Sequence, residues 1–242
     1  MHGNTRFIQL SFAMIKRQGA VLWLRALSIS RRHLGETGSY FRLFPQNFPH
    51  GGPPHDSFLI NDRALRREYK GLQSESHPDK LIGASGFGDK VSGADTAELS
   101  TLINRAYGSL KNPYVRLSHL IQLYHPDHID ITQDEVSKEL IAKFQSASPE
   151  VSLDYKNMLM TVLEAHESLE MATLEEDLEE ISTENDARIV QCEQKVQDIL
   201  QDEWPIQQWN TLIMEAIRLK YWINIENAIR DWEPGKPVHL TH

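Results

Sequence analysis

The second half of the chain carries apolar residues at the spacing of an α-helix with little interruption. Three long segments beyond Ile131 follow this pattern, at about 153–181, 187–201 and 205–232, and Pro205 suits the first turn of the last one. Side chains that recur every three or four residues lie on one face of a helix, which must be buried against another element. Strand patterns are weak throughout. We therefore predict an all-α fold that ends in a C-terminal three-helix bundle.

Two more helices are predicted in the first half. The first begins at Asn61 or Asp62, either of which can cap it. One face of this helix is apolar and the other is basic, with Leu65, Tyr69 and Leu72 against Arg63, Arg66, Arg67 and Lys70. The sequence HPDK, residues 77–80, ends the helix because proline disfavours helical geometry in the residue before it. A glycine-containing connector then leads into a helix at about 94–123 with a break near Pro113.

Composition excludes several classes of protein. The formal net charge of −9 argues against nucleic acid as the main partner, because phosphate binding needs clustered positive charge. The single cysteine, Cys192, excludes an intramolecular disulfide and a multi-cysteine zinc site, and helical packing is its expected role. No apolar run reaches the ~20 residues that a membrane-spanning helix requires. We therefore expect neither nucleic acid nor membrane as a partner.

Catalytic and metal chemistry also find little support. Consecutive acidic residues at 175–176 and 179–180 are typical of a solvated helical face. Three histidines, His119, His125 and His128, lie near one another in the sequence, and an incidental metal site there is the alternative that we considered and set aside. No pairing of a nucleophile with a base is evident. The sequence thus predicts a protein without catalysis, cofactor or metal.

The N-terminus differs sharply in charge from the rest of the chain. Residues 1–35 contain no Asp or Glu, and six basic residues lie there between apolar ones: Arg6, Lys16, Arg17, Arg25, Arg31 and Arg32. This composition is typical of a mitochondrial transit peptide, which we place at 1–38. A secretory signal is disfavoured because Lys16 and Arg17 interrupt its apolar stretch, and a basic tail or a misassigned start is the other alternative. The expected location is the mitochondrial matrix.

The order of a basic helix, a His-Pro-Asp turn and a second helix resembles a J domain. The sequences YFRLF, ALRREYKGLQSESHPDK and TLINRAYGSLKNPYVR take the expected places in turn. In that family the basic helix and the turn dock on a DnaK-type ATPase chaperone and stimulate its ATP hydrolysis. The resemblance implies a chaperone-binding set of six residues: His77, Pro78, Asp79, Arg66, Arg67 and Lys70.

Physical reasoning supports this assignment. Cations on one helical face steer association with an acidic surface and fix orientation. Asp79, held beside Pro78, presents an anion suited to an arginine of the partner. A second His-Pro-Asp at 125–127 has no basic helix of this kind before it, so we interpret it as a polar turn.

The layout of the remaining chain resembles the HscB family, the co-chaperones of iron–sulfur cluster assembly. The segment NPYVRLSHLI leads into an all-helical part that ends in LKYW and IRDWEPGK, and the resemblance extends from about Ser39 to the C-terminus. With one cysteine, the chain resembles the mitochondrial type without an N-terminal zinc motif. The implied organisation is a J domain at 39–123, a connecting segment at 124–150 and a scaffold-binding domain at 151–242.

That resemblance implies two partners, the iron–sulfur cluster scaffold protein and the mitochondrial DnaK-type ATPase chaperone. The chain would bind the scaffold protein, deliver it to the chaperone and stimulate ATP hydrolysis there. The alternative is a general J-domain folding co-chaperone with other clients. Capture of the scaffold protein from mitochondria separates the two.

The long C-terminal helices carry more apolar surface than a small bundle needs. In the first, a core face is formed by Tyr155, Leu159, Val162, His166 and Leu169, while Met160 and Leu163 extend the apolar stripe sideways. The last helix has two apolar faces, Leu212, Ala216, Leu219 and Ile223 on one and Met214, Ile217, Tyr221 and Ile225 on the other. We expect the second face to stay exposed or to meet a partner.

The family resemblance implies that the scaffold protein binds part of this extra apolar surface. The implied scaffold-binding residues are Leu159, Leu163 and Tyr221, with acidic neighbours Glu164 and Glu167. The alternative is that the three apolar residues belong to the core of the bundle.

Overall fold

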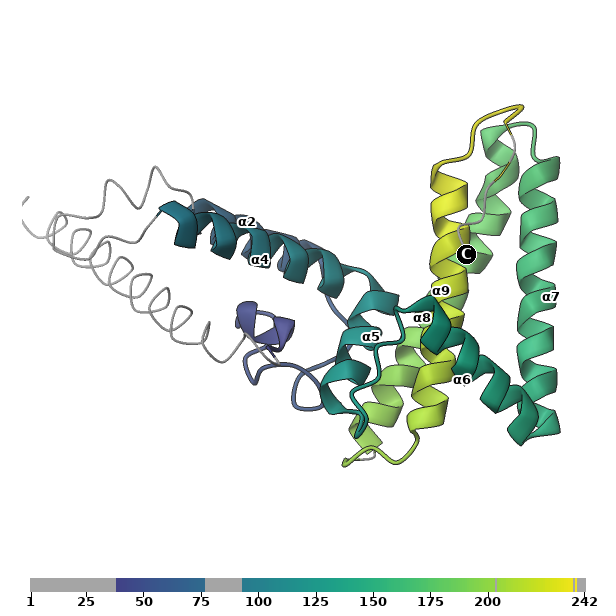
Figure 1. Ribbon diagram of the computed structural model, residues 1–242. Coiled ribbons are helices and arrows are strands. Elements are labelled where there is room, and N and C mark those ends of the chain that lie inside the picture. The colour runs from purple at the N-terminus through teal and green to yellow at the C-terminus, as the bar shows by residue number, and fades with distance from the viewer. Residues whose placement is uncertain (1–37, 77–92, 203, 237, 239–242) are drawn as a thin grey trace, which may run out of the picture. The chain divides into compact units, whose positions relative to one another are not determined.

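A computed structural model describes residues 38–76, 93–202, 204–236 and 238 of the chain (Figure 1). All regular structure in these ranges is helical, which confirms the predicted all-α class. The elements are η1 (Tyr40–Leu43), α2 (Asp62–Ser76), α4 (Gly93–Lys111), α5 (Pro113–Tyr124), α6 (Asp134–Ala147), α7 (Pro149–Met171), η2 (Glu175–Asp177), α8 (Leu178–Asp202) and α9 (Trp209–Arg230). The proposed transit peptide, the first His-Pro-Asp turn and the glycine-containing connector lie outside the described residues.

The chain divides into two compact units. The first comprises the described part of Met1–Gly51 together with Asp62–Gly108, and the second comprises Gly52–Asn61 and Ser109–His242. The first unit therefore holds α2 and most of α4. The second holds α5 to α9.

In the first unit, α2 packs on α4 through the predicted apolar face. Leu65 and Leu72 are buried, and the ring of Tyr69 stacks on Tyr107 with 4.1 Å between the ring centroids. The Tyr69 hydroxyl donates a hydrogen bond of 2.8 Å to Oδ1 of Asn104. These contacts place the apolar side of α2 inward and leave its basic side outward, as the sequence predicts.

The segment before α2 closes the other side of this small core. Phe41 and Phe48 meet edge to face at 5.0 Å, and both side chains are buried. The buried carboxylate of Glu68 accepts hydrogen bonds from the backbone N–H groups of Gln46 (2.8 Å) and Asn47 (3.1 Å). A charge inside the core is thus satisfied by backbone donors, which is the condition under which burial of a carboxylate is tolerated.

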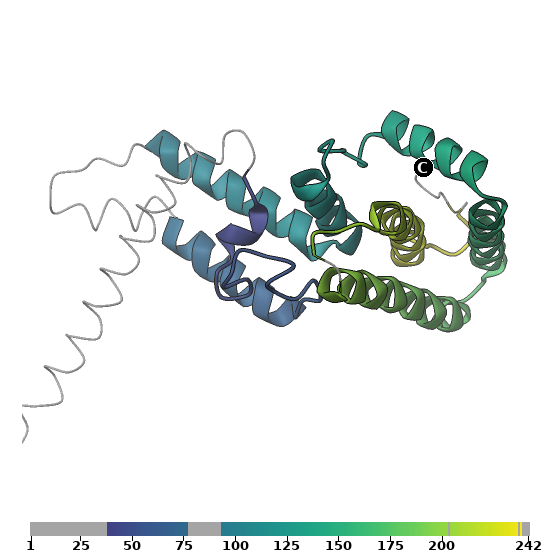
Figure 2. The ribbon, with the colours of Figure 1, turned by 90° about the horizontal axis from the view of Figure 1, so that it is seen from below.

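The second unit is built around α9. Figure 2 shows α9 between α5, α7 and α8, and α7, α8 and α9 contact one another pairwise, as in the predicted three-helix bundle. The expectation that one face of α9 stays open is wrong, since Met214, Ile217 and Ile225 are buried as well as Leu212 and Leu219. On this face Tyr221 meets Tyr155 of α7 and Met214 lies beside the joint between α6 and α7, and α5 packs on α9 as a further neighbour.

Two predicted helix boundaries are also wrong. The segment 153–181 is not one helix, because α7 ends at Met171 and α8 starts at Leu178. Between them Asp177 accepts hydrogen bonds from the backbone N–H groups of Thr173 (2.8 Å) and Leu174 (3.0 Å), which holds the chain in a turn. Pro205 lies in the loop before α9, which starts only at Trp209.

The predicted break near Pro113 is confirmed. Asn112 caps α5 by accepting the Val115 N–H at 3.1 Å, and Pro113 takes the first helical position, where its missing N–H costs nothing. At the start of α5, the buried Arg116 pairs with Glu193 of α8 and lies over the ring of Phe58 at 4.5 Å. Arg116 also donates a hydrogen bond of 2.7 Å to the carbonyl of Leu110, so the last residues of α4, the start of α5 and Phe58 are held together beside α8 within the second unit.

Candidate functional site

The basic face of α2 is open to solvent. Arg66, Arg67 and Lys70 are exposed, whereas Leu65 and Glu68 on the opposite side are buried. Three cations within five residues of one helix form a positive surface on the first unit, and such a surface favours association with an acidic partner. His77, Pro78 and Asp79 follow α2 directly in the sequence and lie outside the described residues.

The second His-Pro-Asp forms a turn between α5 and α6, as predicted. The ring of His125 contacts Trp209 edge to face at 5.0 Å, and its Nδ1 accepts the Asp127 N–H at 3.1 Å. Burial lowers the pKa of His125, which favours the neutral imidazole that this hydrogen bond needs. The imidazole therefore packs on its own unit, while Asp127 points to solvent.

The histidines near this joint do not converge on a ligand. Burial lowers the pKa of His119 to about 4, so its ring is neutral within α5. In the parts of the chain that the structure describes, no three side chains of His, Cys, Asp and Glu come together in a way that would hold a metal ion. No described helix is long and apolar enough to cross a membrane.

The outer side of α7 carries the apolar surplus that the sequence predicts. Met160 and Leu163 are exposed, Leu159 is half-buried, and the neighbouring carboxylates of Glu164 and Glu167 are exposed. The core face of the same helix is buried at Tyr155, Met158, Val162, Ala165 and Leu169. Neighbouring exposed apolar side chains on one edge of a helix make this edge a candidate protein-binding surface.

Tyr221 lies where α9 meets this edge of α7. Its hydroxyl is 3.2 Å from the hydroxyl of Tyr155, and its side chain is half-buried. Burial and the hydrogen bond with Tyr221 raise the pKa of Tyr155, so the Tyr155 hydroxyl stays protonated. Tyr155 is followed at intervals of one helical turn by Leu159 and then Leu163, so these three residues form a row along α7. Tyr221 contacts the first residue of this row. We name Leu159, Leu163, Tyr221, Glu164 and Glu167 the α7 patch.

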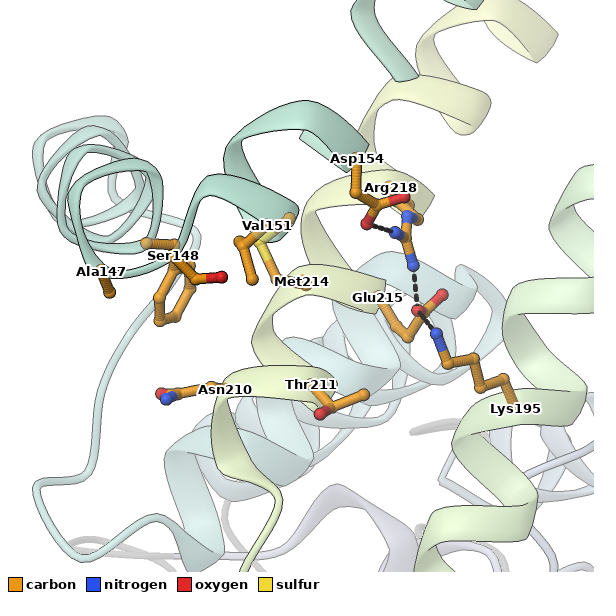
Figure 3. Close-up of a pocket in the computed structure, with 11 residues that line it drawn as sticks. Ala147, Ser148, Val151, Asp154, Lys195, Asn210, Thr211, Met214, Glu215 and Arg218 are labelled. Carbon is orange, nitrogen blue, oxygen red and sulfur yellow. Dashed lines mark hydrogen bonds and ion pairs between the residues drawn. The ribbon is translucent and has the colours of Figure 1, made fainter. Parts of the chain in front are cut away.

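The second unit also contains a cavity with an apolar and a charged side, which the sequence did not predict. It has a volume of about 310 Å³ and lies where the joint between α6 and α7 faces α8 and α9, with Phe144, Val151 and Met214 among its apolar lining residues (Figure 3). Charged groups line its other side. Figure 3 shows Arg218 between Asp154 and Glu215, with Lys195 reaching Glu215 from α8 at 2.6 Å.

This ion-pair chain ties three helices together around a buried carboxylate. Glu215 is buried in α9, and it pairs with Lys195 of α8 and with Arg218, which in turn pairs with Asp154 of α7. The two cations and two anions balance. Only the i, i+3 spacing of Glu215 and Arg218 was visible in the sequence, so the network follows from the packing of helices that are distant along the chain.

We expect Glu215→Ala to destabilise the protein strongly. The substitution leaves Lys195 without its partner and Arg218 with Asp154 alone, and loss of one partner of a buried pair costs up to about 3 kcal/mol. Glu184→Ala is the matched control, because it removes an exposed pair with Arg188 on α8, worth about 0.5 kcal/mol or less. Urea unfolding of both variants measures the difference, and equal losses would contradict the structural role of Glu215.

Comparison with known proteins gives a consistent set of relatives. The family model for the HSCB C-terminal oligomerisation domain matches residues 154–230. The mitochondrial J-type co-chaperone Jac1 of Saccharomyces cerevisiae is 28% identical over 206 residues, which cover 85% of this chain and 95% of Jac1.

Solved structures agree with the sequence comparison. The structure of Saccharomyces cerevisiae Jac1 matches with a TM-score of 0.55 and 26% identity, and the match covers 83% of this chain and 99% of that one. Human co-chaperone HscB matches with a TM-score of 0.52 over 81% of this chain and 82% of its own, at 21% identity, which shows similarity of fold alone. The matches span both the helices before α5 and the C-terminal bundle.

Proposed function

We propose that this chain, which is similar to the HscB-like J-type co-chaperones, binds the iron–sulfur cluster scaffold protein, delivers it to a DnaK-type ATPase chaperone and stimulates ATP hydrolysis by that chaperone. The observation that carries the proposal is the similarity to a mitochondrial J-type co-chaperone along almost the whole length of that relative. The chemistry of ATP hydrolysis belongs to the chaperone. The chain contributes two binding surfaces and acts as an activator.

The proposed mechanism is simultaneous binding through two separate surfaces. The J module, at about 39–123, contacts the chaperone, and the C-terminal part, at about 151–242, holds the scaffold protein. A client held by the same chain that contacts the chaperone is present there at a high effective concentration. Hydrolysis triggered in that complex would then lock the chaperone on the scaffold protein.

On the chaperone side, the exposed cations of α2 provide steering and the His-Pro-Asp turn provides the trigger. Arg66, Arg67 and Lys70 attract an acidic surface of the ATPase. Asp79 would pair with a cation of the chaperone in a geometry that Pro78 restricts, and His77 would complete the contact.

On the scaffold side, the α7 patch presents apolar side chains that are flanked by acidic ones. Leu163 projects into solvent, and Leu159 and Tyr221 are partly open, so a partner can bury all three. Binding energy in such patches concentrates in a few aromatic and aliphatic side chains. Glu164 and Glu167 at the rim favour a scaffold surface that carries positive charge.

The proposed location is the mitochondrial matrix, with residues 1–38 as the transit peptide. The acid-free, arginine-bearing composition of this segment supports the assignment. The mitochondrial location stated for Jac1 is in line with it.

Capture of partners from mitochondria tests the proposal. We expect the tagged full chain, recovered from mitochondrial extract with ADP present, to enrich the cluster scaffold protein and one DnaK-type chaperone above all other proteins. The control is the chain with the α7 patch residue Leu163 replaced by Asp, which should retain the chaperone and lose the scaffold. Enrichment of diverse unfolded clients in place of the scaffold would indicate a general folding co-chaperone.

A further inference from the structure

Four methionines lie in the described residues, and they differ sharply in accessibility. Met160 and Met171 of α7 are 59% and 80% exposed, whereas Met158 of α7 and Met214 of α9 are 6% and 8% exposed. A thioether reacts with peroxides when its sulfur is accessible, so the exposed pair should react first. The chain therefore contains both reactive methionines and buried internal controls.

The single cysteine does not compete for the oxidant. Cys192 is 5% exposed, and burial together with the nearby carboxylate of Glu215 raises the pKa of its thiol to about 12. The thiolate is the reactive form towards peroxide, and at such a pKa it is scarcely populated at the pH of the cell. Oxidation of the second unit is therefore directed to thioethers.

Met160 borders the α7 patch, whereas Met171 lies away from it. Met160 follows Leu159 directly and precedes Leu163 and Glu164 by three and four residues, so its side chain adjoins theirs on the helix. Met171 is the last residue of α7, eight residues beyond Leu163, which is about 12 Å along the helix axis. A change at Met160 therefore alters the patch, and the same change at Met171 does not.

We propose that Met160 is an oxidation switch at the scaffold-binding surface: its oxidation by peroxide weakens binding of the scaffold protein. The inference rests on the function proposed above. A lone pair of the thioether sulfur attacks one oxygen of hydrogen peroxide, and the O–O bond breaks. The attacked oxygen stays on the sulfur, its proton passes to the departing hydroxide, and the second oxygen leaves as water. The product, methionine sulfoxide, places a strong hydrogen-bond acceptor among apolar anchors, where a bound scaffold would have to desolvate it.

The switch is reversible by the chemistry of thioethers. A methionine sulfoxide reductase removes the oxygen with electrons from a dithiol and restores the apolar side chain. Because Met160 is solvent-exposed on a regular helix, its sulfoxide is as accessible to such an enzyme as the thioether is to peroxide.

Site selectivity is measured first, without any partner. The full chain is treated with limiting hydrogen peroxide, and its peptides are followed by mass spectrometry over time. We expect sulfoxide at Met160 and Met171 at least about tenfold faster than at Met158 and Met214, because only the first pair meets solvent. Equal rates at all four sites in the folded protein would overturn the proposal.

Scaffold binding then separates the two exposed sites. For the wild type, Met160→Leu and Met171→Leu, the dissociation constant for the scaffold protein is measured before and after peroxide treatment. We expect the ratio of oxidised to reduced values to be about tenfold or more in the wild type and in Met171→Leu, which corresponds to about 1.4 kcal/mol, and close to one in Met160→Leu. Treatment with methionine sulfoxide reductase should return the oxidised wild type to its reduced value.

The experiment distinguishes failure of the proposed function from failure of the oxidation switch. A reduced protein that does not bind the scaffold overturns the proposed function, and the switch with it. Normal binding by the reduced protein, together with the same oxidised-to-reduced ratio in wild type and Met160→Leu, overturns the switch alone. Circular dichroism of the oxidised protein confirms that any loss of binding is not a loss of fold.

Discussion

Asp79→Asn should reduce the ATPase rate of the chaperone from its stimulated value to its basal value. The substitution keeps the size of the side chain and removes the charge, so the proposed pairing with a cation of the chaperone is lost. Stimulated turnover is measured with purified chaperone, ATP and the full chain at saturating concentration. His77→Gln is expected to have the same effect, because both residues belong to the one rigid turn that Pro78 restricts.

The second His-Pro-Asp provides a control within the same chain. Asp127→Asn changes the same residue type in the same tripeptide, but there the histidine ring packs on Trp209 and no basic helix precedes the turn. Stimulation should therefore stay at the wild-type rate. Scaffold binding and the circular dichroism spectrum should be unchanged in both variants. If Asp79→Asn and Asp127→Asn behave alike, the assignment of the first copy as the chaperone-binding turn is wrong.

The combined replacement of Leu159, Leu163 and Tyr221 by Ala should weaken scaffold binding by about 100-fold or more. Leu163 is 61% exposed and the other two are half-buried, so the three present apolar area that a partner can cover. Stimulation of the chaperone by the J module alone should persist in this variant, because α2 belongs to the other unit. Isothermal titration with the scaffold protein measures the loss.

A thermal melt distinguishes a binding surface from a core. Leu163→Ala alone should leave the melting temperature nearly unchanged, because an exposed side chain contributes little to the free energy of unfolding. Leu169→Ala, on the buried face of the same helix, is the matched control and should cost about 2–5 kcal/mol. The triple variant should fall between these two, since it also removes the contact between Tyr221 and Tyr155. A melt of the triple variant that collapses like that of Leu169→Ala would make the patch a part of the core.

Features that depend on local spacing could be predicted from the order of residues alone. Three such features are the two faces of α2, the break at Pro113, and the exposed apolar residues Met160 and Leu163 of α7. Each of them depends on residues within a few helical turns of one another. Helical periodicity and proline geometry act over that range, so the pattern of residues is sufficient to predict them. The all-helical class follows from the same signal. The domain boundaries and the partner-binding residues remain predictions.

Which apolar faces are covered depends on the packing of helices that are distant in the sequence. Both faces of α9 are apolar in the sequence, and Met214, Ile217 and Ile225 are buried because α9 is packed against α5, α7 and α8 in the folded unit. The end of α7 depends in the same way on a side chain six residues downstream, where Asp177 competes with helical geometry for the backbone donors of Thr173 and Leu174.

The charged interior of the bundle shows the same limit most clearly. Asp154, Lys195 and Arg218 stand on three different helices, and each is an ordinary surface residue by its local pattern. They surround the carboxylate of Glu215 only because α7, α8 and α9 pack side by side. Burial of a charge requires partners in space, and partners in space are set by the packing of helices rather than by the periodicity of any one of them.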